Sequence, residues 1–486
     1  MTPSESERTR ARSTALQVLA LMAIALVLRV LFLGHKGLWQ DEVFSVLFTR
    51  PSNTEFWKIL WAAEANMALY YLALREWVRW FTSDAAVRML SVIPGVLSVP
   101  AMYALGTRLY SRRVGLGAAG LLTVNACAVV YSQEARGYSM LVLFVTLSCW
   151  AFVRLIETAS LLNVVFYVVF TICAFYSHFY AVFIVMAQVC ALGFLPWNRV
   201  PLKSLLGSWL LIAFGMVPGI RVMLLSHGSN LWWLPRPGIV ELYRTLTFLA
   251  AESGKAVGAV LTVLLLVPIV VALRSAWVTL RTNGRSIESF RAGLAPFALL
   301  LPMVTTMALS LWRPMFFHRF LIVCLVPFLL LAAVGLDQLQ NLRTRQRLAI
   351  GIVALSMASV AISYTKVRED WRGAASFTQA AAANDPVVFY IKDAAAPFAY
   401  YRERLGQPLR AEQVLRLEMP PSADQVAQWA NRYPRIWVVR YPSGSKDPLD
   451  VEISDTMGLK FRMCARRAFK EISLSWFVVG DCPAQL

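Results

Sequence analysis

The sequence predicts a polytopic α-helical membrane protein that carries a small soluble α/β domain after its last membrane span. Three observations support this fold class. The 486 residues are 58% apolar and only 15% charged, with a mean hydropathy of +0.56, whereas soluble domains are about half apolar. Eleven apolar runs are long enough for membrane helices. After the last run, short apolar strand patterns alternate with helical ones.

The eleven spans give the chain its predicted path through the membrane. A membrane helix needs a run of about 20 mostly apolar residues. The first run has this length, has no small-residue cleavage site and leads into further apolar runs, so we interpret it as a membrane helix and not as a signal peptide. The predicted spans are 15–34, 89–110, 115–131, 139–157, 162–179, 181–196, 204–220, 256–273, 292–311, 320–336 and 347–364.

Basic residues in the short connectors predict the orientation. Cytoplasmic loops are enriched in Lys and Arg, and here the N-terminal segment and every second connector are basic, as in Arg112 and Arg113 or Arg343, Arg345 and Arg347. The N-terminus is therefore predicted to be cytoplasmic. Eleven crossings then place the C-terminal domain outside; in a bacterial cell this corresponds to the inner (plasma) membrane with the domain in the periplasm.

The net charge of +19 does not indicate a nucleic-acid partner. Many of the basic residues lie in short loops, where they set topology and contact anionic membrane lipid. The others lie on the large extramembrane segments, where their charge is compatible with a polyanionic ligand.

Three predicted outside segments are long: 35–88, 221–255 and 365–486. Residues 55–81 of the first are amphipathic and rich in Trp and Tyr, which favours helices lying at the membrane interface. The last is predicted to hold strands and helices. We therefore predict a membrane catalytic module at 1–364, with the first external loop at 35–88, and an extracytoplasmic domain at 365–486. The predicted strands are 386–391, 434–441 and 473–480, and the predicted helices 373–384 and 422–433.

The cysteine pattern predicts one disulfide and no structural zinc site. Five of the seven cysteines lie within apolar spans, and no Cys or His cluster has metal-ligand spacing. Cys464 and Cys482 both fall in the predicted periplasmic domain, where disulfides persist. The residues between them can form a strand, a turn and a returning strand, which would bring the two cysteines together.

Candidate site residues begin with two acids just beyond the first span. Asp41 and Glu42 are adjacent in "GLWQDEVFSVLF". The next candidates are Glu134, Arg136 and Tyr138 in the short connector "YSQEARGYSM". An Arg in a short outside loop runs against the charge bias, and a guanidinium suits a phosphate through paired hydrogen bonds. The alternatives are a helix N-cap for the acids and a surface ion pair for Glu134 with Arg136.

Two further outside connectors contain functional residue types. "FYSHFYAVF" holds His178 and Tyr180, and "LWRPMFFHRFLIV" holds His318 and Arg319. The ordinary interpretation of His178 is a structural residue or part of an aromatic belt, and that of Arg319 is interfacial snorkelling. The functional alternative for the second connector is another cationic contact for an anion at the membrane surface. Arg29 lies inside the first span, near enough to its outer end to snorkel outward. All these candidates except Arg29 are predicted on one membrane face.

Five blocks of the sequence resemble the GT-C membrane glycosyltransferases, and in particular the family 39-like bacterial members related to protein O-mannosyltransferases and aminoarabinose transferases. The blocks occur in the family's order along most of the chain. They are "RVLFLGHKGLWQDEVFS", "YSQEARGYSMLVLF", "YSHFYAVF", "HRFLIVCLVPFLLLAA" and "EDWRGAASFTQAAAANDPVVFYI".

The resemblance implies a GT-C fold and a sugar donor on a polyprenyl or dolichyl phosphate. It implies that Asp41 is the catalytic base, that Glu42 is its supporting neighbour and that Arg136 lies near the donor phosphate. Many relatives carry a Pro-Pro pair in the first external loop, where this chain has Met67 and Ala68. The acceptor is therefore not carried over: a glycolipid, a polysaccharide and a protein stay open.

The predicted reaction is an inverting displacement of a hexosyl or pentosyl group from a lipid phosphate. A carboxylate takes the proton from the acceptor hydroxyl, and a guanidinium stabilises the leaving phosphate. Because adjacent helical residues point about 100° apart, Asp41 and Glu42 have separate roles, with Glu42 supporting or contacting a metal. No cofactor is firmly predicted, and a divalent cation stays open. The rival functions are a transporter or flippase of lipid-linked sugars, which would carry ionisable residues deep in several spans, and a non-catalytic scaffold.

Overall fold

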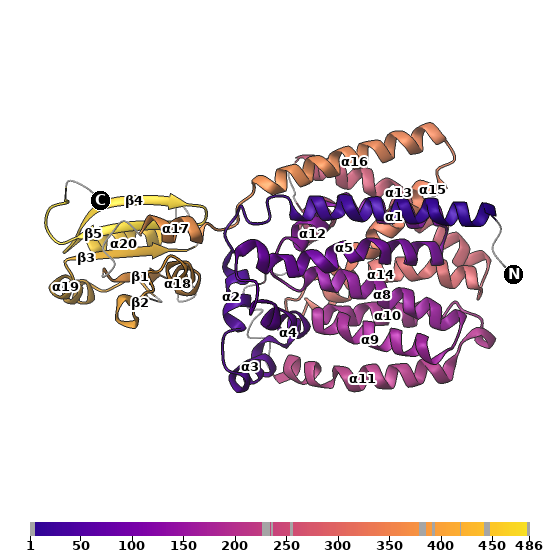
Figure 1. Cartoon of the computed structure of the whole chain (residues 1–486), viewed down its shortest axis with the longest axis horizontal. Helices are drawn as coiled ribbons and strands as arrows, with labels where there is room; N and C mark the ends of the chain where they lie inside the picture. Colours follow the sequence, from indigo (N-terminus) through magenta and orange to yellow (C-terminus); the bar gives the residue numbers. More distant parts are fainter. Residues whose placement is uncertain are drawn as a thin grey trace. The chain divides into compact units, whose positions relative to one another are not determined.

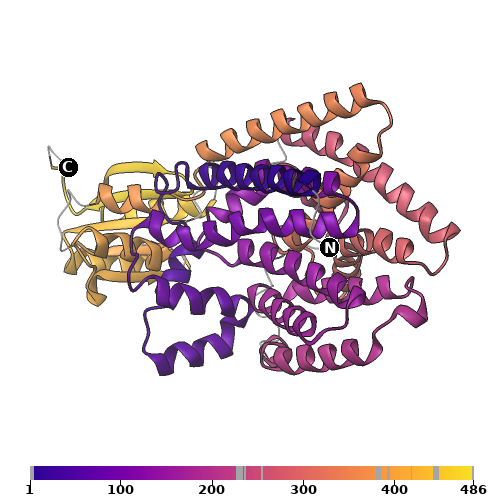
Figure 2. The ribbon, with the colours of Figure 1, turned by 45° about the vertical axis from the view of Figure 1, so that its right-hand side comes forward.

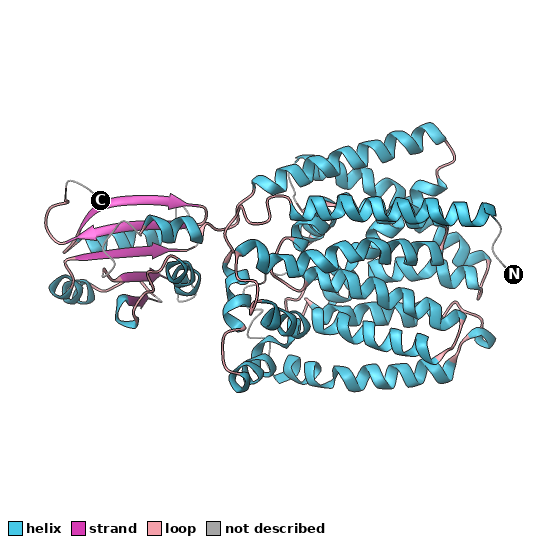
Figure 3. Cartoon of the chain, in the orientation of Figure 1, coloured by secondary structure: helices cyan, strands magenta, loops and turns pink. Residues whose placement is uncertain are grey.

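The chain forms two compact units. The computed structural model describes residues 5–225, 234, 237–252, 256–378, 385–390, 394–417, 419–441 and 448–483. The bundle unit comprises Met1–Leu33, Thr49–Thr82 and Ala86–Thr365, and the sheet unit comprises Gly34–Phe48, Ser83–Ala85 and Lys366–Leu486. All described strands lie in the sheet unit (Figure 3).

Long helices running side by side build the bundle unit (Figures 1 and 2). Their apolar side chains also form the outer surface, as at Phe214, which is 80% exposed. The helices are α1 Glu5–Val30, α3 Asn53–Ile59, α4 Ala68–Trp77, α5 Asp84–Leu109, α6 Arg112–Val124, α7 Ala126–Ser132, α8 Tyr138–Glu157, α9 Leu161–Ser177, α10 Val182–Leu192, α11 Leu202–Leu225, α12 Ile239–Ala251, α13 Ala256–Thr282, α14 Ile287–Leu309, α15 Leu325–Gln338 and α16 Leu342–Thr365.

Every predicted span corresponds to a helix or helix pair in the bundle unit. Within the described residues, eight helices are long and apolar enough to cross a membrane, and the bent pair α6 and α7 makes up to nine. The two remaining spans correspond to the shorter apolar helices Leu161–Ser177 and Phe179–Leu192. The chain is therefore a multi-pass membrane protein. Its orientation stays a prediction, as does the assignment of 1–364 as the catalytic module.

The bend between α6 and α7 explains why the Arg29 side chain is buried in the bundle unit. The two helices meet at 58°, and the last carbonyl groups of a helix have no partner within it. The Arg29 guanidinium donates to Leu122 O at 3.2 Å and Thr123 O at 3.3 Å, and its Nε donates to Ser132 Oγ. Arg29 is fully buried. The prediction that it snorkels outward is wrong, because the broken helix offers it unpaired carbonyls inside the bundle.

The first external loop is helical in the bundle unit, as predicted for residues 55–81. α3 continues into a π-helical turn, Leu60–Glu64, and a 3₁₀ turn, Ala65–Met67, before α4 begins. The Asn66 side chain accepts a hydrogen bond from Phe179 N at 2.9 Å, so this loop is attached to the connector between α9 and α10.

The sheet unit contains a five-stranded mixed sheet in the order β2-β1-β3-β5-β4. β1 pairs in parallel with β2 and β3, and β3, β5 and β4 pair antiparallel. The parallel pairs follow from crossover helices between their strands. The elements are α2 Gln40–Phe48, α17 Trp371–Phe377, β1 Val387–Tyr390, α18 Ala395–Arg404, β2 Val414–Leu417, α19 Ala423–Arg432, β3 Arg435–Arg440, α20 Pro448–Gly458, β4 Arg462–Phe469 and β5 Ile472–Val478.

Both faces of the sheet are covered, because alternate strand residues point to opposite sides. On one face, Val388 and Val438 share a core with Ile453 and Met457 of α20. On the other face, the Trp437 ring lies 5.9 Å from Trp476 and 6.0 Å from Phe377 of α17. The three predicted strands are present, whereas β2 was not predicted. The predicted helix 373–384 begins with α17, and its residues 379–384 lie outside the described residues.

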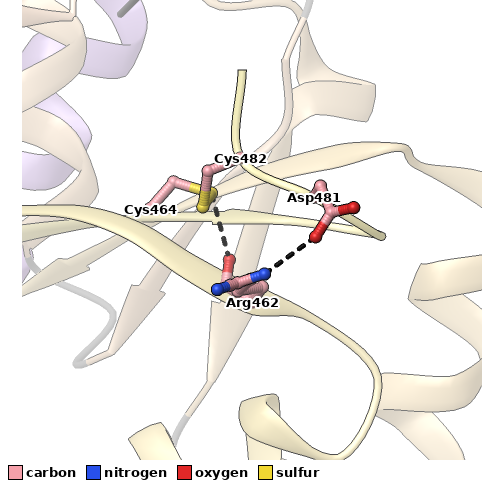
Figure 4. Close-up of a disulfide and its surroundings, with 4 residues drawn as sticks. All are labelled: Arg462, Cys464, Asp481 and Cys482. Atoms are coloured by element: carbon pink, nitrogen blue, oxygen red, sulfur yellow. Dashed lines mark hydrogen bonds and ion pairs between the residues drawn. A yellow bond between two sulfur atoms is a disulfide. The ribbon is translucent and has the colours of Figure 1, made fainter. Parts of the chain in front are cut away.

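The predicted disulfide joins Cys464 on β4 to Cys482 beyond β5, with the two Cα atoms 5.4 Å apart (Figure 4). β4 and β5 form an antiparallel pair, so the strand, turn and returning strand bring the cysteines together as expected. Arg462 donates to Asp481 Oδ1 at 2.8 Å beside the bridge (Figure 4).

We expect Cys464 and Cys482 to react with an alkylating reagent only after reduction. The same protein labelled after denaturation and reduction is the control, because both thiols should then react. Because the bridge closes a loop of sequence separation 18, replacing both cysteines by Ser should destabilise the sheet unit by about 3 kcal/mol. The measurement is mass mapping of the labelled sites, and labelling of both residues before reduction would contradict the bridge.

Candidate active site

Asp41 lies in the first turn of α2, in the sheet unit. The helix begins there because Glu42 Oε2 accepts a hydrogen bond from the backbone N of Trp39 at 3.1 Å, as the acidic residue of a capping box does. Glu42 is fully buried, whereas Asp41 is half-buried. The two acids therefore have different surroundings, and Glu42 supports the turn that presents Asp41.

Glu369 fixes the residue that precedes Asp41. Its Oε2 accepts hydrogen bonds from Gln40 N at 2.8 Å and from Trp371 Nε1 at 2.6 Å, and its Oε1 accepts from Tyr441 OH at 2.7 Å. Burial raises the pKa of the Glu369 carboxyl above its ordinary value, the three donors oppose that rise, and the charge of Asp41 adds to it. Asp41 and Glu369 are thus two interacting carboxyl groups in the sheet unit.

Arg136 belongs to the bundle unit, in the loop between α7 and α8. Its Nη1 donates to Tyr71 OH at 3.0 Å, and Tyr71 OH donates to Glu64 Oε2 at 3.3 Å. Its backbone N donates to the carbonyl of Glu134 at 2.8 Å, and Glu134 itself is buried. Arg136 is half-buried, so the first external loop orients the guanidinium without removing it from solvent.

His178 ends α9 and is buried in the connector that follows. Its Nδ1 accepts a hydrogen bond from Tyr180 N at 3.2 Å, which requires an unprotonated Nδ1. Burial, and then the charge of Arg136, lowers the pKa of His178 far below its ordinary value. The ring stacks on Tyr138 with the centroids 6.1 Å apart. The Tyr180 hydroxyl donates to the carbonyl of Met315.

The three connectors meet through aromatic side chains in the bundle unit. His178 lies 5.3 Å from Phe320, and His318 lies 4.3 Å from Phe317 and 5.1 Å from Phe248 of α12, as measured between ring centroids. Arg319 lies with its guanidinium 5.9 Å from the Phe317 ring. We call this closed circuit of contacts between side-chain rings the aromatic circuit. Its members are Tyr131, Tyr138, His178, Phe320, Phe317, His318 and Phe248.

The structure thus places the predicted residues in two groups, one in each unit. The bundle unit brings together, around the aromatic circuit, Tyr138, His178, Tyr180, His318 and Arg319, with Arg136 beside them. Asp41 and Glu42 lie in the sheet unit.

Sequence reasoning missed several partners of these residues. They are Glu64, Tyr71 and Phe248 in the bundle unit and Glu369 and Tyr441 in the sheet unit. The resemblance of "EDWRGAASF" to a family block was the signal that could have singled out Glu369.

The protonation of His178 should make the bundle unit acid-sensitive. Because its pKa in the folded chain lies below the value of about 6.5 for an unfolded chain, the unfolded chain binds the proton more tightly, and stability is lost as the pH falls below about 6.5. We expect Tm in detergent to fall from about pH 7.5 to about pH 5, and to fall less in His178→Asn, which can still accept from Tyr180 N.

His35→Asn provides the matched control, because His35 is exposed. The measurement is Tm against pH for the three proteins. An identical pH dependence of Tm in the wild type and His178→Asn would contradict a buried neutral imidazole.

Within the described residues, no group of three or more His, Cys, Asp or Glu side chains could hold a metal ion. The described site residues offer carboxylates in the sheet unit, which can take part in proton transfer, and guanidinium groups in the bundle unit, which can stabilise an anion.

The fold is that of the GT-C membrane glycosyltransferases. ArnT from Cupriavidus metallidurans in the apo state superposes with a TM-score of 0.59 at 13% identity, over 94% of this chain and 97% of that chain. The structure of ArnT bound to undecaprenyl phosphate gives 0.58 at 13% identity with the same coverage. The archaeal oligosaccharyltransferase AglB from Archaeoglobus fulgidus, in complex with an inhibitory peptide and a dolichol-phosphate, gives 0.52 at 12% identity over 89% of this chain and 70% of that chain.

Residues 64–222 match the family model described as dolichyl-phosphate-mannose-protein mannosyltransferase. The match includes Arg136, the end of the first external loop, and the members of the aromatic circuit that lie between the start of α7 and the residue after α9. No curated protein matches the sequence. The family match and the shared fold confirm the resemblance to the GT-C glycosyltransferases and indicate glycosyltransferase activity.

Proposed function

We propose that this protein transfers a hexosyl or pentosyl group from a polyprenyl-phosphate donor to an acceptor at the extracytoplasmic face of the membrane. The observation that carries the proposal is the presentation of Asp41 at the start of α2, directly after the first membrane helix of a GT-C fold. The two structural neighbours named for their lipid phosphates, ArnT with undecaprenyl phosphate and AglB with dolichol-phosphate, support a lipid-phosphate donor.

Asp41 is the proposed base. An acceptor hydroxyl oxygen forms a bond to the anomeric carbon of the sugar while the bond from that carbon to the phosphate oxygen breaks. The hydroxyl proton passes to the Asp41 carboxylate, and the electron pair of the broken bond leaves with the lipid phosphate. A single displacement of this kind inverts the anomeric centre. Glu42 keeps a supporting role, because its carboxylate caps the turn that carries Asp41.

Arg136 is the proposed partner of the donor phosphate. The leaving phosphate gains a negative charge as the sugar departs, and a guanidinium offers paired donors to it. Tyr71 and Glu64 orient Arg136 within the bundle unit. We assign Glu134, Tyr138, His178, Tyr180, His318 and Arg319 to donor and acceptor binding, with neutral His178 as a hydrogen-bonding group and not a charge.

The proposal also includes the sidedness predicted from the charge bias. The N-terminus is cytoplasmic, residues 1–364 form the catalytic module, and residues 365–486 form a periplasmic domain. The disulfide between Cys464 and Cys482 supports this side for the domain, because bridges persist in oxidising compartments. The acceptor is a glycolipid, a polysaccharide or a protein.

Sugar transfer by the purified full-length protein in proteoliposomes tests the function. Radiolabelled hexosyl and pentosyl polyprenyl phosphates are offered with envelope glycolipid, polysaccharide and protein fractions as acceptors. We expect label in one acceptor fraction and release of polyprenyl phosphate, both formed about 10²–10⁴-fold more slowly by Asp41→Asn. Movement of the donor across the bilayer without label in any fraction would favour the transporter and contradict the proposal.

A further inference from the structure

We propose that Glu369 is a positioning residue for the catalytic step: it caps the N-terminus of α2 from a distant part of the chain and so holds Asp41 in its reactive direction. This inference rests on the proposed function, in which Asp41 is the base. Glu369 is separated from Gln40 by 329 positions in sequence, so the contact exists only in the folded sheet unit.

The first turn of α2 needs such a partner. The first four N–H groups of a helix have no acceptor within it, and Gln40 is the first residue of α2. Glu369 Oε2 accepts from Gln40 N at 2.8 Å. Since Asp41 is the next residue, a rigid Gln40 fixes the backbone from which the Asp41 side chain projects. A negative charge at a helix N-terminus also interacts favourably with the helix dipole.

The adjacent residue reinforces the same turn. Arg368 lies with its guanidinium 4.7 Å from the centroid of the Trp39 ring, and Trp39 is the residue before α2. Two consecutive residues, Arg368 and Glu369, therefore contact two consecutive residues at the start of α2. This pairing favours a positioning role over an isolated hydrogen bond.

Glu369 is itself held rigidly. It is 6% exposed, and both of its oxygens are used: Trp371 Nε1 shares Oε2 with Gln40 N, and Tyr441 OH donates to Oε1. The Trp371 ring is fully buried and packs 5.2 Å from the Tyr441 ring. Because this hydrogen-bond network holds the backbone next to Asp41, the base should keep its position when substrate binds. A displacement of a catalytic group by about 1 Å costs about a hundredfold in rate.

Substitutions at position 369 test separately whether the shape or the charge of the Glu369 side chain is needed. In Glu369→Gln, the amide oxygen can accept from both Gln40 N and Trp371 Nε1, while the amide nitrogen faces Tyr441 OH, which can also accept. This variant should keep most of the rate. Glu369→Ala leaves Gln40 N without its acceptor, and we expect kcat to fall about tenfold to a hundredfold with the KM for the donor unchanged.

The decisive measurement is a double-mutant cycle with Asp41 in the full-length protein. We expect Glu369→Ala to lower kcat in the wild-type background and to have no further effect in Asp41→Asn, because there is then no base to misplace. Asp385→Ala is the matched control: Asp385 is another buried acid of the sheet unit, paired with Arg435 at 3.2 Å, and its loss should leave kcat unchanged.

Equal losses from Glu369→Ala in both backgrounds would overturn the proposal, and so would an equal loss from Asp385→Ala. If Glu369→Ala does not fold, as judged by Tm, the same cycle with Tyr441→Phe decides, with a loss of a few fold expected only when Asp41 is present. An Asp41→Asn protein with the full wild-type rate would instead remove Asp41 as the base, and a wild-type protein without sugar transfer would refute the proposed function, so these failures are distinguishable from failure of the Glu369 proposal.

Discussion

Replacing Asp41 by Asn should lower the rate of sugar transfer by about 10²–10⁴-fold, the usual contribution of a positioned acid or base. Asn keeps the size and the hydrogen-bonding shape of the side chain but cannot take the proton from the acceptor hydroxyl. The KM for the lipid-linked donor should change little, because the base acts on the acceptor. The measurement is initial rates of transfer with the purified protein over a range of donor concentrations.

Asp370→Asn is the control for this experiment. Asp370 also belongs to the sheet unit, and its Oδ1 caps α17 by accepting from Gly373 N at 2.9 Å. Asn is as good an N-cap as Asp, so this variant loses a carboxylate without losing a structural contact. It should keep the wild-type rate. Near-normal turnover in a folded Asp41→Asn protein would remove Asp41 from the mechanism.

Replacing Arg136 by Ala should lower kcat by about 10²–10³-fold, as the loss of a donor to a developing negative charge does. Arg136→Lys should recover only part of this, because an ammonium is a point charge and cannot form the paired hydrogen bonds of a guanidinium. Lysine would also lose the oriented contact that Nη1 makes with Tyr71 OH. The donor KM should rise as kcat falls.

Arg313→Lys is the matched control, because Arg313 is also predicted in an outside connector and is exposed. It should leave both constants unchanged. The measurement is kcat and KM with the lipid-linked donor, together with Tm to confirm that each variant is folded. Wild-type constants in Arg136→Ala would leave this residue with a surface role only.

The membrane spans and much of the sheet unit could be predicted because the responsible signals are local. The transfer of an apolar run into lipid depends on the composition of that run alone, so all eleven predicted spans correspond to helices or helix pairs. The strand patterns of β1, β3 and β5 were readable for a similar reason, since each contains several consecutive or alternating apolar residues and is almost entirely buried. β2 was missed because its four residues, with Arg416 exposed, lie at the edge of the sheet.

The candidate site was predictable in part. Asp41, Arg136 and His178 stood out because charged or titratable residues in short connectors of a membrane protein need a reason. Their partners did not stand out. Tyr71 and Phe248 look like ordinary interfacial aromatics in the sequence. Only the packing of α4 brings Tyr71 to Arg136, and only the packing of α12 brings Phe248 into the aromatic circuit.

The sequence by itself determined that this is a multi-pass membrane protein with a disulfide-bridged α/β domain and a candidate carboxylate after its first span. Only the tertiary structure decided that Arg29 turns inward to the broken helix and that Glu369 supports Asp41. The physical reason is the range of the interactions. Hydropathy and strand alternation are properties of neighbouring residues, whereas an unpaired carbonyl or N–H at a helix end forms a hydrogen bond with whichever polar side chain the fold brings to it.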